Sequence, residues 1–200
     1  MAITVFNKIL SQATQAGQLT NKSTDAITWL RDKASNVRTV DTNRVIQQGV
    51  DRNRTNLQLG RMYLFSYDPK LKDTLPYHDK FPLIFPFAKD ATGFWGINMH
   101  YLPFQFRAIL MDSLYELIND TAKQDETTKL RLTYNVLNSA AKFKYFKPCV
   151  KHYLNSQVQS KFIYIMPNEW DVALFLPLHK FVGATASAVY RDSRRRIAGR

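Results

Sequence analysis

The sequence has few cysteines, no long apolar run and few acidic residues. Cys149 is the only cysteine in 200 residues, so no disulfide can form within the chain and folding does not depend on an oxidising compartment. No apolar run approaches the roughly 20 residues that a membrane-spanning helix needs. The N-terminus lacks the apolar segment and cleavage site of a signal peptide. We therefore expect a protein that is made in a cytoplasm and has no membrane partner.

Catalytic and metal-binding motifs are also missing. The sequence has no HExxH pair, P-loop, nucleophile elbow or dinucleotide fingerprint. His78, Asp73 and Asp79 could meet around an ion, but aspartates in turns are usually structural. Glu169 and Asp171 form an isolated acidic pair, which is too few carboxylates for a metal-dependent nuclease. We expect no enzyme, no metal, no cofactor and no small-molecule substrate.

Positive charge is what the chain has in excess. Lysine and arginine number 28 against 16 aspartates and glutamates, which gives a formal charge of +12 and favours anionic partners. Between Glu126 and Glu169 there is no acidic residue at all, and the C-terminus ends in RDSRRRIAGR. Basic side chains neutralise phosphates without reading sequence. The residues that we expect to contact DNA phosphates are Lys142, Lys144, Lys147, Lys151, Arg194, Arg195 and Arg196.

The spacing of the central lysines suggests a helical surface. Lys147 lies three residues after Lys144 and four before Lys151, so the three can share one face of a helix. Three aromatic residues interleave with them and could stack on bases at a frayed end, although we favour core positions for them: Phe143, Tyr145 and Phe146. The basic charge could also face an acidic surface on a partner protein.

The stretch from Gly60 to Arg107 predicts a small antiparallel sheet or half-barrel. Its apolar runs are rich in aromatic and β-branched residues and are separated by turn residues, at 61–67, 81–88 and 93–99. An SH3-like barrel would fit this pattern. Pro82 and Pro86 cannot donate to a ladder, so the middle run is expected at an edge or in an irregular pairing. His100 follows the last run, and we expect it to be a hydrogen-bonded structural histidine.

The remaining patterns are mainly helical and complete an α+β fold class. Apolar residues recur at helical spacing in segments at about 3–16, 24–37, 103–119, 126–143 and 148–159. Short β candidates follow at 161–166 and 172–176. We expect an N-terminal helical arm, a small antiparallel β unit, packed helices, a short C-terminal β segment and a basic tail. The expected units are a helical arm and connector at 1–56, a core domain at 57–182 and the tail at 183–200.

Two segments carry a family resemblance. The first holds the strings GRMYLFSYDPK, LPYHDKFPLIFPF and GFWGINMHYLPFQFRAILMDSLYEL, and the second is KFKYFKPCVKHYLNSQVQSKFIYIMPNEWDVALFLP. Both resemble a virion-associated protein of T-even-type tailed bacteriophages. The family most similar is the DNA end protector, also described as a head-completion protein. The resemblance covers residues 60–177, and the first 56 residues add nothing to it.

The resemblance implies a non-enzymatic virion protein, synthesised in the host cytoplasm, that binds DNA and shields the genome ends. It carries over no functional residue, so the seven basic candidates depend on charge alone. The alternative is a structural tail, baseplate or neck subunit that acts through protein–protein contacts. In either case the N-terminal arm is the segment expected to reach other virion proteins.

Overall fold

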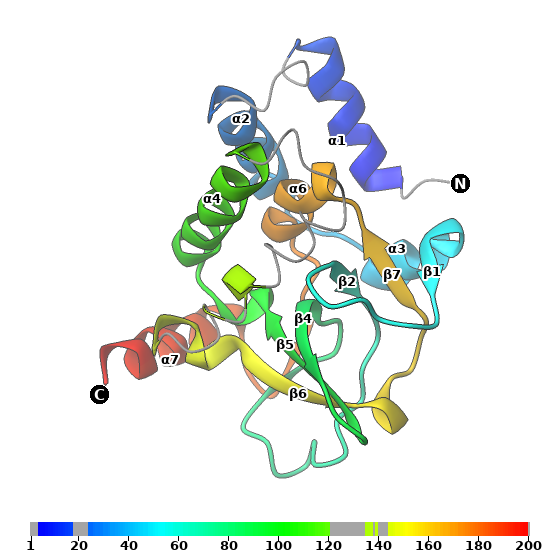
Figure 1. Ribbon diagram of the computed structural model, residues 1–200, viewed down its shortest axis with the longest axis vertical. Coiled ribbons are helices and arrows are strands. Elements are labelled where there is room, and N and C mark those ends of the chain that lie inside the picture. The colour runs from blue at the N-terminus through cyan, green and yellow to red at the C-terminus, as the bar shows by residue number, and fades with distance from the viewer. Residues whose placement is uncertain (1–3, 18–23, 121–134, 138, 140–143, 200) are drawn as a thin grey trace.

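A computed structural model describes residues 4–17, 24–120, 135–137, 139 and 144–199. The chain has an α+β fold, as predicted, with helices packed beside an antiparallel sheet (Figure 1). In the described residues the main sheet has six strands in the order β1–β7–β2–β4–β5–β6. Their bounds are Asn53–Arg54 (β1), Phe162–Ile165 (β7), Met62–Leu64 (β2), Leu83–Lys89 (β4), Gly93–Asn98 (β5) and Val150–Leu154 (β6). A separate ribbon pairs β3 (His78–Asp79) with β8 (Phe181–Val182).

The three apolar runs of the central stretch form β2, β4 and β5, which confirms those predictions. Strand β4 pairs with β2 on one side and with β5 on the other, so it is not an edge strand. Its pairing register shifts between Pro86 and Ala88. The proline is thus accommodated by an irregular pairing, the second of the two expected outcomes. Strand β7 confirms the β candidate at 161–166.

The turn between β4 and β5 is closed by a side chain and by a glycine. Asp90 Oδ1 accepts hydrogen bonds from the backbone N–H groups of Thr92 at 2.8 Å and Gly93 at 2.9 Å. A Cβ atom at Gly93 would lie only 2.0 Å from the carbonyl oxygen of Tyr153 on β6. Glycine is therefore required here because the β5 and β6 backbones approach each other closely.

Each face of the sheet packs against a different hydrophobic cluster. One face packs with the helices around side chains such as Phe85, Ile97 and Ile163. The other face encloses an aromatic cluster in which Phe65, Tyr153 and Phe162 are central, with ring centroids 5.1–5.4 Å apart from Phe65. Because successive side chains of a strand point to opposite faces, β5 serves both clusters, with Ile97 in the first and Phe94 in the second.

The N-terminal helices contribute to the first of these clusters. Helices α1 (Thr4–Gln15), α2 (Thr24–Ser35) and α3 (Thr42–Gln48) bury Phe6, Leu30 and Val45 against the same core as the sheet. The following 3₁₀ turn η1 (Val50–Arg52) leads into β1, which pairs with β7. The apolar faces of the expected arm are thus covered within this chain, whereas the division at residues 56 and 182 stays a prediction.

Helix α4 (Phe104–Asp120) confirms the helix expected at 103–119. Of its predicted apolar stripe, Leu110 and Leu114 are buried, but Ile109 is exposed. The segment expected as a strand at 172–176 is instead helix α6 (Trp170–Phe175), preceded by the 3₁₀ turn η5 (Pro167–Glu169). Every residue of α6 is buried. A short, fully buried apolar run has no amphipathic period, so its sequence does not distinguish strand from helix.

The helix expected at 148–159 is also wrong. The chain there forms the 3₁₀ segment η3 (Lys144–Cys149), then strand β6, then the 3₁₀ turn η4 (Asn155–Gln157). Strand β6 pairs with β5 from Gly93 to Ile97, and this tertiary pairing overrides the local helical spacing. The helix expected at 126–143 falls largely outside the described residues.

Replacing Gly93 with alanine should strongly destabilise the protein. The new Cβ would overlap the backbone of Tyr153, and neither strand can move without disturbing the β4–β5–β6 ladder. We expect the free energy of unfolding to fall by about 3 kcal/mol or more, measured by urea denaturation. Ala91→Ser, an exposed change in the same turn, is the control. Equal stability of G93A and the control would contradict the close approach.

Candidate nucleic-acid interface

The C-terminal segment, predicted as a basic tail, forms helix α7 (Ala186–Ala198). Thr185 caps its start by accepting a hydrogen bond from the N–H of Ala188 at 3.3 Å, and Gly199 ends it in the left-handed conformation with φ 73°. Val189, Ser193 and Ile197 are buried at four-residue intervals along one side. The small and polar composition of this segment conceals a helix because the buried stripe is narrow.

Side-chain hydrogen bonds fix the orientation of α7 on the fold. Ser193 Oγ donates to the carbonyl oxygen of Tyr101 at 2.7 Å in a buried contact. Tyr190 Oη accepts from Arg107 Nη2 at 2.8 Å, and Asp192 accepts from the Tyr77 hydroxyl. The remaining surface of the helix is therefore held towards solvent, and it carries the exposed arginines Arg191, Arg194, Arg195 and Arg196.

The exposed arginines differ in how freely they can meet an anion. Arg196 Nε donates to Asp192 at 2.9 Å in an intrahelical ion pair. Among the described residues, Arg191, Arg194 and Arg195 form no ion pair. Arg195 and Arg196 lie in the last turn, where positive charge also favours the helix dipole. The arginines of α7 that are available to bind phosphate are therefore Arg191, Arg194 and Arg195.

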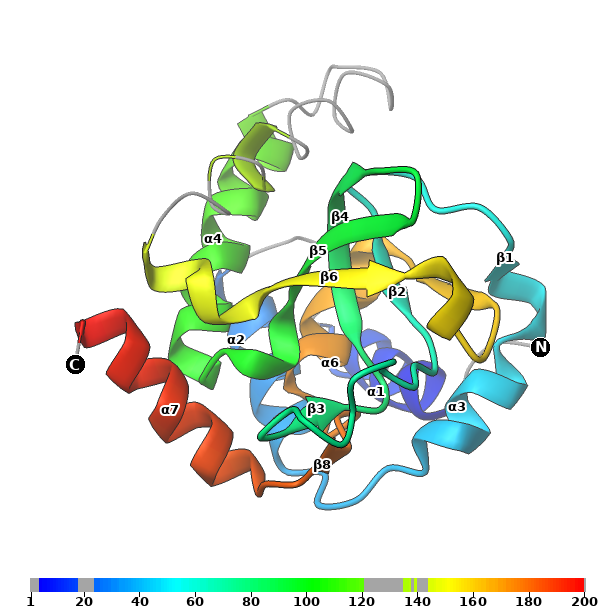
Figure 2. The same ribbon diagram turned by 90° about the horizontal axis from the view of Figure 1, so that it is seen from below.

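The second basic segment lies beside α7. Segment η3, which leads into β6, packs against α7, and the two lie side by side in both views (Figures 1 and 2). Lys147 on η3 is exposed. The fold thus brings two predicted basic segments together. Lys144 and Lys147 lie in the 3₁₀ helix η3, but Lys151 lies on strand β6, so the three lysines do not share one helix. We call the exposed side chains of α7 and η3 the basic face. Lys142 lies outside the described residues, and of Lys144 only the backbone is described.

Lys151 is a weaker candidate than its sequence position indicated. On β6 it is half-buried, and its Nζ lies 4.1 Å from the centroid of the Tyr101 ring. Burial, with the nearby positive charge of Arg196, lowers the pKa of Lys151 to about 8. At pH 7 this amine still carries most of its charge, which it loses as the pH rises through about 8. Its phosphate contact therefore stays a prediction, with less exposed charge than that of Lys147.

The aromatic and thiol groups of this region belong mainly to the core. Phe146 packs against the first cluster, as favoured, whereas Phe143 and the side chain of Tyr145 are not described. Cys149 is buried, and its Sγ donates to the carbonyl of Phe146 at 2.9 Å. Burial raises the pKa of this thiol to about 12, so it is a structural residue.

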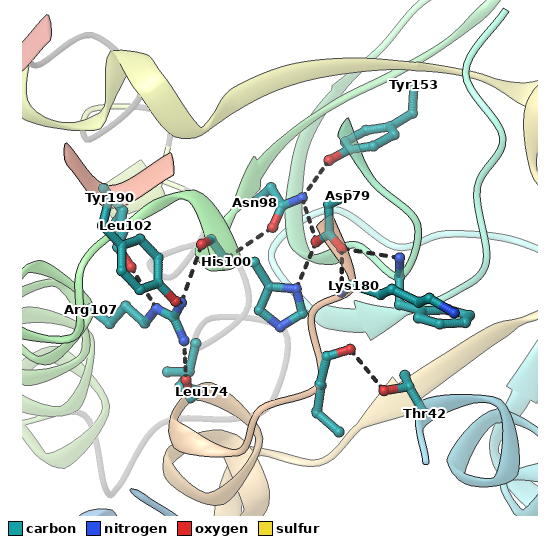
Figure 3. Close-up of polar contacts among 12 residues, drawn as sticks. Thr42, Asp79, Asn98, His100, Leu102, Arg107, Tyr153, Leu174, Lys180 and Tyr190 are labelled. Atoms are coloured by element: carbon teal, nitrogen blue, oxygen red, sulfur yellow. Dashed lines mark hydrogen bonds and ion pairs between the residues drawn. The ribbon is translucent and has the colours of Figure 1, made fainter. Parts of the chain in front are cut away.

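A buried polar network lies behind the basic face. The sequence predicted only one of its members, His100. Asp79 on β3 accepts hydrogen bonds from His100 Nδ1 at 2.7 Å and Asn98 Nδ2 at 3.3 Å (Figure 3). It also accepts from the backbone N–H groups of Phe81 and Lys180, both at 3.1 Å. His100 is thus a hydrogen-bonded structural histidine, as predicted. Asp79 joins β3, β8 and the end of β5.

A buried cation lies on the other side of His100. The guanidinium of Arg107 on α4 is fully buried and donates to the carbonyl oxygens of Leu102 at 2.8 Å and His100 at 3.2 Å, and to that of Leu174. Its fourth partner is the Tyr190 hydroxyl on α7 (Figure 3). Since arginine stays protonated even when burial lowers its pKa, this network holds a buried charge that these four oxygens solvate.

Metal sites and membrane segments are not found in the described part of the chain. No three histidine, cysteine or acidic side chains there gather in a way that could hold a metal ion. Asp79 is instead bonded within the network above. None of the described helices is both long and apolar enough to cross a bilayer.

The structure defines a basic α+β protein with positive side chains gathered on one exposed surface. Residues 27–192 match the family model of the phage T4 terminal DNA protecting protein. Because the match covers most of the chain, the protein belongs to this family. The match includes the predicted range of 60–177 but begins earlier, in α2, so the N-terminal segment does contribute to the family pattern. No curated protein and no solved structure matches the chain.

The buried histidines predict a loss of stability in weak acid. Burial, followed by the charges of His100 and Arg107, lowers the pKa of His179 to about 3, and burial also lowers the pKa of His100. Unfolded histidine takes up a proton near pH 6.5, so the unfolded state binds more protons and stability falls as the pH drops below that value. His179 alone should contribute a loss of about 2 kcal/mol between pH 7 and pH 5.

This dependence is measured by urea denaturation at several pH values. His179→Phe keeps a ring beside Tyr190 and Phe181 but removes the titrating group, so it should flatten the decline. Phe181→Leu disturbs the same packing without removing a proton site and should lower stability equally at each pH. A wild-type stability that is constant from pH 7 to pH 5 would contradict the neutral, buried histidines.

Proposed function

We propose that this protein binds the ends of linear duplex DNA through its basic face and shields those ends from exonucleases. Membership of the terminal DNA protecting family supports this function. The observation that carries the choice of surface is the packing of α7 against η3, which gathers exposed cations from two distant parts of the sequence. The protein acts as a non-enzymatic component of the phage particle, after synthesis in the host cytoplasm.

The dimensions of α7 suit a contact with several phosphates. Its 13 residues extend over about 20 Å, and duplex DNA carries roughly one charge per 1.7 Å of axis. Arg191, Arg194 and Arg195 are exposed on α7, outside its buried stripe. Each can donate two parallel hydrogen bonds to one phosphate. Such contacts give affinity that is independent of sequence and sensitive to salt.

A structural neck, tail or baseplate subunit is the second candidate, and head completion would combine both activities. Exposed apolar side chains favour a protein contact: Leu71 is 62% exposed, Leu75 42% and Val182 43%. A partner contact through the N-terminal helices would have to use their polar faces, because their apolar faces pack in the core. In this alternative the basic face would meet an acidic surface of another virion protein.

Removing two arginines should weaken DNA binding without unfolding the protein. Arg194→Ala with Arg195→Ala removes two exposed cations from α7, so the slope of log K against log salt should become shallower by about 1.8. Affinity for a short linear duplex, measured by fluorescence anisotropy, should fall about tenfold or more. Stability should change by less than about 1 kcal/mol. Lys8→Ala with Lys33→Ala, on α1 and α2, removes equal charge as the control.

End recognition is tested with closed circular DNA of equal mass as competitor. Poor competition by the circle, together with protection of the linear duplex from an exonuclease, is the expected result. Equal competition would mean general phosphate binding and would contradict end recognition. If the protein did not bind DNA even at low salt, the proposal would be overturned. The positive charge would then favour a structural subunit that contacts an acidic protein surface.

A further inference from the structure

A second positively charged site lies outside the basic face. A cleft of about 490 Å³ opens beside the β3–β8 ribbon and is lined by Asp68, Lys72, His78 and Lys80, among others. The three basic residues come from a 9-residue span that sequence reasoning assigned to turns. Their charges converge because the loop after β2 folds back over β3.

The walls of this cleft are held by backbone hydrogen bonds. The chain at Ser66–Asp68 lies between two other segments. The N–H of Tyr67 donates to the carbonyl of Lys80 at 3.0 Å, and the N–H of Gln159 donates to that of Ser66 at 2.8 Å. Lys80 N–H in turn donates to the carbonyl of Lys180 at 2.9 Å, which ties the cleft to β8. The cleft is therefore a fixed concavity of the fold.

Cations outnumber the one carboxylate in this cleft. Asp68 accepts from Lys72 Nζ at 2.8 Å. This hydrogen bond, with the charges of Lys72, His78 and Lys80, lowers the pKa of Asp68, so all three basic groups act on the same point. Among the described residues, the ammonium of Lys80 forms no ion pair. An added anion would find Lys80 and His78 available and Lys72 shared with Asp68.

The cleft is connected to the basic face by the chain itself. Val182 of β8 lines the cleft, and the chain continues from it directly into α7 (Figure 2). The Tyr77 hydroxyl, at the end of the same loop, donates to Asp192 on α7. The start of α7 and Arg195 are separated by about 15 Å along the helix. A bound duplex that contacts both places would be held at two points.

We propose that this cleft binds a phosphate group of the DNA strand that the basic face engages. The inference rests on the proposed function and extends it. A terminal phosphate carries a charge of about −1.5 to −2, more than a carboxylate, and presents three acceptor oxygens to the surrounding donors. In the free protein, Asp68 occupies Lys72 and limits the binding of weaker anions.

Two single substitutions test the site: one should lower the affinity for DNA and the other should raise it. Lys80→Ala should lower affinity for linear duplex DNA about fivefold and reduce the salt slope by about 0.9. Asp68→Asn removes the competing carboxylate and should raise affinity. Lys33→Ala, on α2 at the far end of the molecule in Figure 1, removes the same charge as K80A and should have little effect. Unchanged affinity in both cleft variants, or equal losses in K80A and K33A, would overturn the proposal.

The source of the phosphate is resolved by comparing duplexes with 5′-phosphate and 5′-hydroxyl ends. A loss in K80A confined to the 5′-phosphate duplex would assign the cleft to the terminal phosphate. Equal loss on both would assign it to an internal phosphate, and either result supports the site.

A separate titration with inorganic phosphate keeps this proposal distinct from the proposed function. Saturable NMR shifts of the His78 ring in the wild type, lost in K80A, would support the cleft even if the protein bound no DNA. Absence of any saturable shift would overturn it even if end binding through α7 were intact.

Discussion

The structure depends on two buried opposite charges with His100 between them. Asp79 accepts hydrogen bonds from the end of β5 and from residues next to β3 and β8. Arg107, on α4, donates to the segment just before that helix, to α6 and to α7. His100 contacts both, through its ring to Asp79 and through its carbonyl to Arg107. Removing either charge would leave its own buried hydrogen-bonding partners unsatisfied, which costs several kcal/mol. This requirement fixes how the ribbon, the sheet and the helices are placed relative to one another.

The basic face is a consequence of that arrangement. Arg107 reaches the surface helix only through Tyr190, and Ser193 adds a buried hydrogen bond one turn further along. These contacts fix the rotation of α7 about its axis, so the arginines on its other side face solvent. A helix of four arginines with one aspartate would gain little from packing alone. Its position is set by polar contacts with the core, and the positive surface follows from them.

Sequence reasoning was most successful where residue type and period agree. It predicted β2, β4, β5 and β7 from their β-branched and aromatic runs, and α4 from apolar residues at helical spacing. Each of these patterns is compatible with one type of secondary structure. It failed at β6 and α6, since Val150–Leu154 becomes a strand only by pairing with β5 and Trp170–Phe175 is buried on all sides. The buried position of Arg107 could not be predicted, because an arginine in an amphipathic helix is normally exposed to solvent. The convergence of η3 with α7, and of Lys72 with Lys80, is a property of the tertiary fold.

Charge alone does not explain how a protein distinguishes a DNA end, because phosphates are present along the whole duplex. A second fixed anion site, as proposed for the cleft, would change this, since two rigid points of contact restrict the orientation of the duplex as well as its affinity. The cleft and α7 are joined through β8 and through the Tyr77–Asp192 hydrogen bond, so their separation does not vary independently. If the cleft takes a terminal phosphate, a closed circle can satisfy only the α7 contact. Preference for ends then follows from geometry, with no base-specific contact.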